Sequence, residues 1–337
     1  MNLFELTRAL IDIDSTTGRE REIGEFLFHH LQALADRLGE GTVERMPVEG
    51  DRFNVFAFWG EPAVVLSTHI DTVPPFIPSS EDVEHIHGRG ACDTKGGLAA
   101  MLQALAELLD EGVRGLGLLL TVGEETDSIG AQVANRHPCG SRYLINCEPT
   151  ENRLALGSKG FLYVKLEAQG RAAHSAYPEL GDSAIDKLVD VLARLRVLPL
   201  PTDPVMGETT LNIGTLAGGR APNIVADQAR AEVTIRTVGD AAELKRRISA
   251  AVHGVPDVRI AEIRDTPAIH LGSIPGFETT VVKYTTDIPR LGSWGEPFLL
   301  GPGSIHVAHT PDERVPKRHL IDAARHYKNM VRRLLDR

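Results

Sequence analysis

The sequence has few cysteines, few aromatic residues and no long hydrophobic run. Only 3 of its 337 residues are cysteines. They show no paired spacing, which argues against a disulfide framework and fits a reducing cytoplasm. The longest apolar runs, such as 116–122, are far shorter than the roughly 20 residues that cross a membrane. The first residues include Glu5, Asp12 and Asp14 but no basic segment, so we expect no signal peptide.

The chain also lacks an excess of positive charge. Its 36 basic and 46 acidic residues give a net charge of −10, which argues against a nucleic-acid or anionic-membrane surface. With 42% hydrophobic and 24% charged residues, the composition is that of a globular protein, and the length suggests about two domains. We therefore expect a cytoplasmic protein with no nucleic acid and no membrane as partner.

Helical and extended patterns alternate along the chain, which predicts an α/β protein. Hydrophobic periodicity predicts helices over 18–38, 98–109, 129–136 and from about 317, and buried strands over 54–59, 63–68, 116–122, 142–147 and 297–300. Near Ser158 the pattern changes to β-α-β-β-α-β, the ferredoxin-like order, which ends near Thr266. We therefore predict one larger α/β domain, made of residues 1–157 and 268–337, with a smaller domain inserted at 158–267.

A histidine and an acid stand at the end of one buried strand. In α/β sheets, ligands collect at the carboxyl ends of the strands. His69 and Asp71 are two residues apart, so in an extended segment they point the same way. A neutral imidazole is a good zinc ligand, and a nearby carboxylate can hold its other nitrogen. The alternative is a strand-end histidine beside an acid that merely forms a turn.

Further acids follow the other predicted strands and one loop. Asp93 comes just before an apolar helix, where it could simply be an N-cap. Glu124 and Glu125 close a very hydrophobic strand, and neighbouring carboxylates repel unless a cation or a shared proton relieves them. Glu148 stands before Pro149, where acids are common in turns. Each position alone has an ordinary structural explanation, but their joint placement at strand ends and loop-to-helix junctions favours a site.

Two histidines near the C-terminus, His306 and His309, could complete this site or could both be surface residues. Two histidines and three carboxylates suit two zinc ions bridged by one carboxylate. In that interpretation Glu124 is not needed as a ligand and can act as a general base for metal-bound water. The candidate ligands are His69, Asp93, Glu125, Glu148 and His309.

The same residues carry a family resemblance. The matching segments are Ser67-Thr68-His69-Ile70-Asp71-Thr72-Val73-Pro74, Gly88-Arg89-Gly90 through Asp93-Thr94-Lys95-Gly96-Gly97, Gly123-Glu124-Glu125, Cys147-Glu148-Pro149-Thr150 and Ala308-His309-Thr310-Pro311-Asp312-Glu313. In this order they resemble the co-catalytic zinc exopeptidases and deacylases, which include acetylornithine deacetylase, succinyl-diaminopimelate desuccinylase, aminoacylase and carboxypeptidase G. The resemblance implies a mixed sheet flanked by helices, with an inserted ferredoxin-like α+β lid domain.

The resemblance also implies residue roles and a cofactor. It makes Asp71 the residue that orients a ligand, Asp93 the bridge between two metals and Glu124 the general base. It implies two zinc ions per chain, with cobalt as a substitute, and a cis peptide bond after Asp93. The remaining ligands would be His69 and Glu148 for the first metal and Glu125 and His309 for the second.

Residues outside the metal site are assigned in the same way. In relatives a histidine at the position of His174 reaches across a homodimer, formed through the lid, and helps to hold the carbonyl oxygen; the alternative is an exposed strand-end histidine. Arg236 would clamp a substrate carboxylate, which suits its planar fork, or would form a surface ion pair. Asn223 and the backbone of Gly303 would contact the substrate.

These roles predict a di-zinc hydrolase that cleaves the amide bond of an N-acylated amino acid. The alternative within the enzyme class is a dipeptidase or carboxypeptidase. Outside that class, a non-catalytic amino-acid or peptide binder would keep the fold, but none of the ligands is lost. A cysteine hydrolase that uses Cys92 is disfavoured because the thiol adjoins Asp93 and has no obvious histidine partner.

Overall fold

The computed structural model describes residues 1–337 and divides the chain into two compact units. Unit 1 comprises Met1–Leu156, Leu271–Thr280 and Thr286–Arg337, and unit 2 comprises Gly157–His270 and Val281–Thr285. Unit 2 therefore extends beyond the predicted 158–267. One reason is the short strand β15 (Ile269–His270), which pairs with Gly157 and Ser158.

Unit 1 is built around a six-stranded mixed sheet with the strand order β1-β2-β6-β3-β7-β17. Strands β6, β3, β7 and β17 run parallel, whereas β2 is antiparallel to β6 and β1 is antiparallel to β2. The central strands β3 and β6 are buried along their whole length, which explains their nearly continuous apolar sequences. The strands are β1 (Thr42–Glu49), β2 (Arg52–Trp59), β3 (Val64–His69), β6 (Leu116–Thr121), β7 (Tyr143–Asn146) and β17 (Glu296–Leu299).

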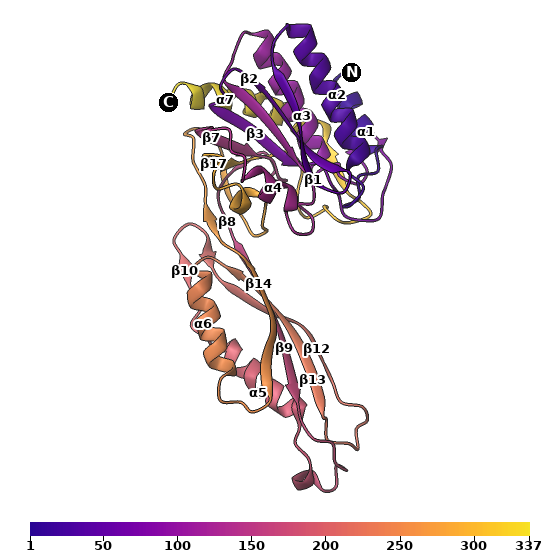
Figure 1. Cartoon of the computed structure of the whole chain (residues 1–337), viewed down its shortest axis with the longest axis vertical. Helices are drawn as coiled ribbons and strands as arrows, with labels where there is room; N and C mark the ends of the chain where they lie inside the picture. Colours follow the sequence, from indigo (N-terminus) through magenta and orange to yellow (C-terminus); the bar gives the residue numbers. More distant parts are fainter. The chain divides into compact units, whose positions relative to one another are not determined.

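Helices cover both faces of this sheet (Figure 1). Alternate residues of β6 face opposite sides: Leu118 and Leu120 join the core formed with α1, α2, α3 and α7, and Leu119 packs towards α4 and Trp294. The helices are α1 (Leu3–Ile11), α2 (Arg21–Leu38), α3 (Lys95–Asp110), α4 (Ile129–Ala134) and α7 (Lys317–Leu335). The predicted mixed α/β architecture is therefore confirmed, while α1 and the edge strand β1 have no counterpart among the predicted elements.

Unit 2 contains a four-stranded antiparallel sheet with the order β12-β13-β9-β14. Strands and helices follow one another as β-α-β-β-α-β. In addition, two strands of two residues each, β10 (Thr202–Asp203) and β11 (Gly207–Glu208), form a short hairpin. Its core joins α5 and α6 to the sheet. The elements are β9 (Gly160–Gln169), α5 (Ala184–Arg196), β12 (Thr210–Gly218), β13 (Gln228–Thr237), α6 (Ala241–Val252) and β14 (Val258–Thr266).

Short strands complete the description. A three-stranded sheet in unit 1 has the order β18-β5-β4 and is formed by β4 (Ser80–Glu81), β5 (His85–His87) and β18 (Arg314–Pro316). The remaining strands are β8 (Leu154–Ser158) and β16 (Thr279–Val282), and two 3-10 helices span Pro178–Leu180 and Ile288–Arg290. None of the helices combines the length and the apolar character that a membrane crossing requires.

Parallel strands determine where the polar segments meet. Because β3, β6 and β7 run in the same direction, their carboxyl ends lie at one edge of the sheet. His69 ends β3, the pair Glu124 and Glu125 follows β6, and Glu148 follows β7. Helix α3, which begins directly after Asp93 and Thr94, lies close to the end of β7: a Cβ atom on Gly97 would stand 2.1 Å from the Sγ atom of Cys147.

This close approach leads to a stability prediction. Replacing Gly97 by Ala adds about 1 kcal/mol of helix propensity, but the overlap with Cys147 outweighs it, and overpacking of this kind costs about 1–3 kcal/mol. We expect Gly97→Ala to lower the unfolding free energy measured in urea. In a Cys147→Ala background the same substitution should be tolerated, and additive effects of the two changes would contradict the packing argument.

Candidate metal centre

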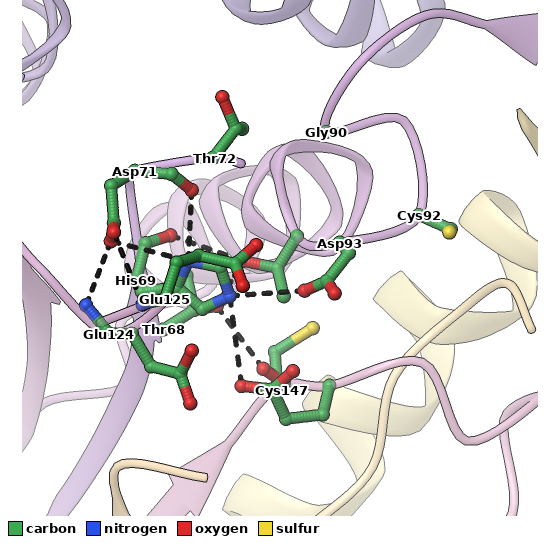
Figure 2. A network of polar contacts seen from close by, with 12 residues as sticks. Thr68, His69, Asp71, Thr72, Gly90, Cys92, Asp93, Glu124, Glu125 and Cys147 are labelled. Atoms are coloured by element: carbon green, nitrogen blue, oxygen red, sulfur yellow. Dashed lines mark hydrogen bonds and ion pairs between the residues drawn. The ribbon is translucent and has the colours of Figure 1, made fainter. Parts of the chain in front are cut away.

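His69 lies at the centre of the polar cluster, with a carboxylate residue on each side (Figure 2). Its Nδ1 atom is 3.0 Å from the backbone oxygen of Asp71 and 3.5 Å from Oδ1 of the same residue. Its Nε2 atom is 3.1 Å from Oδ1 of Asp93 and 3.8 Å from Oε1 of Glu148. If Nδ1 carries the proton and donates it to Asp71, the lone pair of Nε2 faces the two acids, as a metal ligand requires.

Asp93 is shared between two groups of ligands. Its Oδ1 atom faces His69, and its Oδ2 atom is 3.2 Å from Nε2 of His309. The same nitrogen of His309 is 3.1 Å from Oε1 of Glu125. Two groups that could each hold an ion therefore exist, His69–Asp93–Glu148 and Asp93–Glu125–His309, with their ligand atoms within 4.8 Å of one another in each group. The peptide bond between Asp93 and Thr94 is cis, as the resemblance implies.

The surroundings of these groups fit cations. Glu148 is buried, and its Oε1 atom has no hydrogen-bond partner within the chain. Burial raises the pKa of Glu148 well above its usual value, and the charges of Asp93 and Glu124 add to this effect. Hydrogen bonds from the imidazole of His309 to the carboxylates of Asp93 and Glu125 in turn raise the pKa of His309 to about 10. Imidazole and carboxylate groups of this kind are the ligands that divalent ions such as zinc take in proteins.

Asp71 connects the two halves of the cluster. Its Oδ1 atom accepts a hydrogen bond from the backbone N–H of Glu124 (3.0 Å), and its Oδ2 atom accepts one from that of Glu125 (3.2 Å). Oδ2 also accepts a hydrogen bond from Oγ1 of Thr17 (2.8 Å). Burial opposes the ionisation of Asp71, but the hydrogen bonds from His69 and Thr17 hold its pKa below the usual value. One carboxylate thus orients the imidazole of His69 and fixes the backbone of the Glu124–Glu125 pair.

Glu124 is partly buried, and its carboxylate forms no hydrogen bond within the chain. Burial raises the pKa of Glu124 well above its usual value. Of the charges nearby, His69 lowers this pKa, whereas Asp287 and Glu125 raise it. A carboxylate in such surroundings accepts and returns a proton more readily near neutral pH than an exposed one.

Glu313 has a structural role beside the site, although the sequence analysis names it only as the last residue of the segment around His309. Its Oε1 atom accepts hydrogen bonds from the backbone N–H groups of Gly90 (2.9 Å), Cys92 (3.3 Å) and Asp93 (3.3 Å). Its Oε2 atom pairs with the buried guanidinium of Arg89. Glu313 therefore fixes the segment that presents Asp93. The only signal in the sequence is an acid at a set distance after a ligand histidine.

The surroundings of Cys92 do not favour a nucleophilic thiol. The side chain is buried, and burial raises the pKa of its thiol well above the usual value, with Glu313 and Asp93 adding to the effect. A thiol in these surroundings stays protonated, so the structure argues against a cysteine hydrolase.

His174 and Asn223 lie near each other in unit 2. The residue after His174, Ser175, donates its backbone N–H to the carbonyl oxygen of Asn223 (2.9 Å), and His174 forms a β-bridge with Ile224. Both His174 and Asn223 are exposed. The Nδ1 atom of His174 accepts the backbone N–H of Ala176 (3.1 Å), which leaves Nε2 for an external partner.

Arg236 lies at the other end of the same sheet. It pairs with Phe161 at the beginning of β9, whereas His174 follows the end of that strand, so about 25 Å of strand separates them. The guanidinium lies 4.9 Å from the centroid of the Phe161 ring and forms no ion pair within the chain. The alternative that Arg236 forms a surface ion pair is therefore wrong for this structure. The distance along β9 also shows that one copy of unit 2 does not bring Arg236 and His174 together.

Gly303 has partners within unit 1 for both of its backbone polar groups. Its N–H lies 3.4 Å from Nδ1 of His319, and its carbonyl oxygen accepts the N–H of Glu151 (2.9 Å). Its φ of +82° and the 2.5 Å between an added Cβ and the Cβ of Cys92 explain the glycine by conformation and packing. Because its N–H and its carbonyl oxygen already have partners within the chain, the predicted contact of the Gly303 backbone with substrate is not supported by these hydrogen bonds.

Comparison with known proteins agrees with this geometry. The model of the peptidase family M20/M25/M40 matches residues 65–333. The chain belongs to this family. Its members are co-catalytic metal-dependent exopeptidases and amidohydrolases, so the predictions of an enzyme and of its family are confirmed.

Individual relatives cover nearly the whole chain. A peptidase M20 domain-containing protein of Schizosaccharomyces pombe is 40% identical over 339 residues, which cover 98% of this chain and 84% of that protein. A "Probable carboxypeptidase" of Aspergillus oryzae is 36% identical over 374 residues, which cover 98% of this chain and 87% of that protein. The crystal structure of aminopeptidase PepT from Bacillus cereus superposes with a TM-score of 0.82 at 20% identity, covering 99% of this chain and 98% of that one. This last similarity supports the fold alone.

The central place of Asp71 gives the second prediction. In Asp71→Asn an amide NH₂ replaces one of the two oxygens that accept N–H groups, so the imidazole of His69 and the Glu124–Glu125 backbone lose their common anchor. Loss of such a supporting group weakens metal binding about 10–100-fold. Titration of the metal-free protein with zinc, followed by calorimetry, measures this. Unchanged affinity in a folded Asp71→Asn variant would contradict the role given to Asp71.

Proposed function

We propose that this protein is a di-zinc hydrolase that cleaves an amide bond whose nitrogen belongs to an amino acid with a free carboxylate. The observation that carries the proposal is the position of Asp93 between His69 and His309, with one oxygen towards each imidazole. The carboxylate of Glu124, which forms no hydrogen bond within the chain, adjoins the same cluster. Two bridged ions beside a free carboxylate would supply the Lewis acid and the base that metal-assisted hydrolysis uses.

Two substrate classes share this bond. An N-acyl amino acid and a peptide with a free C-terminus both contain an acyl carbon bonded to the nitrogen of an amino acid that keeps its carboxylate. The resemblance of the motifs supports the N-acyl amino-acid deacylase. The curated relative from Aspergillus oryzae, which carries the name carboxypeptidase and matches 98% of the chain, supports the second candidate, hydrolysis of a C-terminal peptide bond.

Different residues of the site would bind the ions, transfer the proton and position the base. His69 and Glu148 would hold one ion and Glu125 and His309 the other, with Asp93 between them. When bound, the two ions supply Lewis acidity for the scissile carbonyl and lower the pKa of a water molecule. Glu124 would accept a proton from a water molecule and return it to the leaving nitrogen, and its raised pKa makes the carboxylate a stronger base for the first transfer. Asp71 keeps the Glu124 backbone in place meanwhile.

Arg236 is the candidate for recognition of the substrate carboxylate. Its guanidinium is half-buried against Phe161 and has no acidic partner, and burial lowers its pKa. A planar guanidinium without a partner is suited to a bidentate contact with a carboxylate. Asn223 lies beside His174, far from Arg236 in the same sheet, so these residues would act together only if two copies of the chain contribute to one site.

A homodimer is therefore part of the proposal. His174 of a second copy would donate a hydrogen bond to the carbonyl oxygen as negative charge develops there. Strand β12, one of the two edge strands of the unit 2 sheet, leaves Leu216 half exposed and is a candidate for the contact between copies. The three free cysteines are consistent with activity in the cytoplasm.

A substrate comparison tests the proposed bond. Zinc-loaded protein is given N-acetyl-L-ornithine, N-succinyl-diaminopimelate and a set of N-blocked dipeptides, and the released amino acid is measured. The matched control is each N-blocked dipeptide with its C-terminal carboxylate converted to an amide. We expect release from the acids and at least about tenfold slower release from the amides, since the contact with Arg236 is lost. Equal rates on acids and amides would contradict carboxylate recognition.

The role of Glu124 gives a further prediction. Glu124→Gln keeps the size of the side chain but removes the group that moves the proton, so turnover should fall by a factor of about 10²–10⁴. Zinc content, measured by mass spectrometry of the dialysed protein, should remain that of the wild type because Glu124 is outside both ligand groups. Loss of zinc along with activity would show that Glu124 is a ligand instead of the base.

A further inference from the structure

A second cluster of metal-ligating side chains lies on unit 1, apart from the residues that surround Asp93. It consists of Asp82, His85 and His87, whose ligand atoms lie within 4.8 Å of one another. The two histidines are two residues apart on strand β5, so their side chains project from the same face. Their ring centroids are 5.8 Å apart, with the rings tilted by 52°.

Asp82 is held so that its oxygens face the two rings. Its Oδ1 atom accepts the backbone N–H groups of Glu84 and His85, each at 2.7 Å, and lies 3.7 Å from Nδ1 of His85. Its Oδ2 atom lies 3.0 Å from Nε2 of His87. The turn thus fixes the carboxylate before any ligand arrives, and the nitrogens that face it belong to two different rings.

No lysine or arginine forms an ion pair with the carboxylate of Asp82. The nearby ammonium of Lys317 bonds to the backbone oxygen of Asp82 (2.7 Å) and to the carboxylate of Glu81 (2.9 Å), and it leaves the carboxylate of Asp82 to the imidazoles. Hydrogen bonds from His87 and from the backbone lower the pKa of Asp82, so this carboxylate is ionised at neutral pH. The cluster offers one anionic oxygen and two imidazole nitrogens.

The cluster is accessible from solvent. The side chains of Asp82, His85 and His87 are 55%, 27% and 33% exposed. Asp82 and His87 also line a hollow of about 380 Å³ next to Gly88 and Pro311. Three protein ligands with room for water on the open side match the coordination that zinc and its neighbours in the first transition series accept.

We propose that Asp82, His85 and His87 form a third, separate site for a borderline divalent cation such as Zn²⁺. The two histidines pair through β5 with β18, His85 opposite Pro316 and His87 opposite Arg314. Strand β18 follows directly on Glu313 and leads into α7. A bound ion therefore fastens β5 to the turn at Asp82 and stabilises the small sheet that carries the chain from His309 to α7.

Zinc counting tests this site independently of hydrolysis. Chelator-treated full-length protein is equilibrated with increasing free Zn²⁺, and bound zinc is counted by mass spectrometry and by calorimetry. We expect His85→Gln/His87→Gln to bind one equivalent fewer than the wild type, and Asp82→Asn to bind that equivalent at least about tenfold more weakly. The matched control is His137→Gln/His253→Gln, which removes two exposed histidines outside every ligand group and should bind the wild-type number.

Thermal unfolding supplies the second measurement. Zn²⁺ added beyond the tight equivalents should raise the Tm of the wild type and of the control but not that of His85→Gln/His87→Gln, because only a site in the folded state stabilises by binding. Equal zinc counts and equal Tm increments in all four proteins would overturn the proposal and leave Asp82 and His87 as an ion pair. Loss of the equivalent in the control as well would overturn it too, since binding would then be nonspecific.

Discussion

The repulsion among buried acids at the edge of the unit 1 sheet is the constraint on which the rest of the site depends. Asp93 and Glu148 are buried, Glu124 and Glu125 adjoin them, and the groups that pair with the cluster are the imidazoles of His69 and His309. Such a set of carboxylates is stable only with cations, protons or both. The fold supports it by bringing the ends of three parallel strands together, and metal binding then couples to deprotonation of the ligands.

Supporting residues give the cluster its geometry. Asp71 ties His69 to the backbone after β6, and Glu313 ties the segment before α3 to the loop that carries His309. The buried pair of Arg89 with Glu313 neutralises a carboxylate that would otherwise add to the negative field around Asp93. Removing one partner of such a pair is costly because it leaves the other charge buried alone. Residues far apart in the sequence therefore hold the ligands in place, so the site forms only when the whole of unit 1 is folded.

The sequence predicts most elements because long amphipathic helices and buried parallel strands have strong patterns. Helix α7 begins at the predicted Lys317, and β6 begins at the predicted Leu116. Edge strand β1 is missed because two consecutive exposed residues, Glu44 and Arg45, interrupt the alternation. Four candidate ligands, His69, Asp93, Glu125 and Glu148, could be found because each lies at the end of a strand or just before a helix. His309 lies in the loop before β18 and could be found only through its motif. The role of Glu313 and the separation of His174 from Arg236 could not, since both depend on loop conformation and strand register.

The central claim is that Asp93 bridges two ions. The most direct measurement is the anomalous diffraction of a zinc-loaded crystal at wavelengths on either side of the zinc absorption edge. The account predicts two peaks roughly 3.5 Å apart, one next to His69 and Glu148, the other next to Glu125 and His309, with Asp93 contacting both. A single peak at full zinc loading, or two peaks with Asp93 bound to neither, would contradict it.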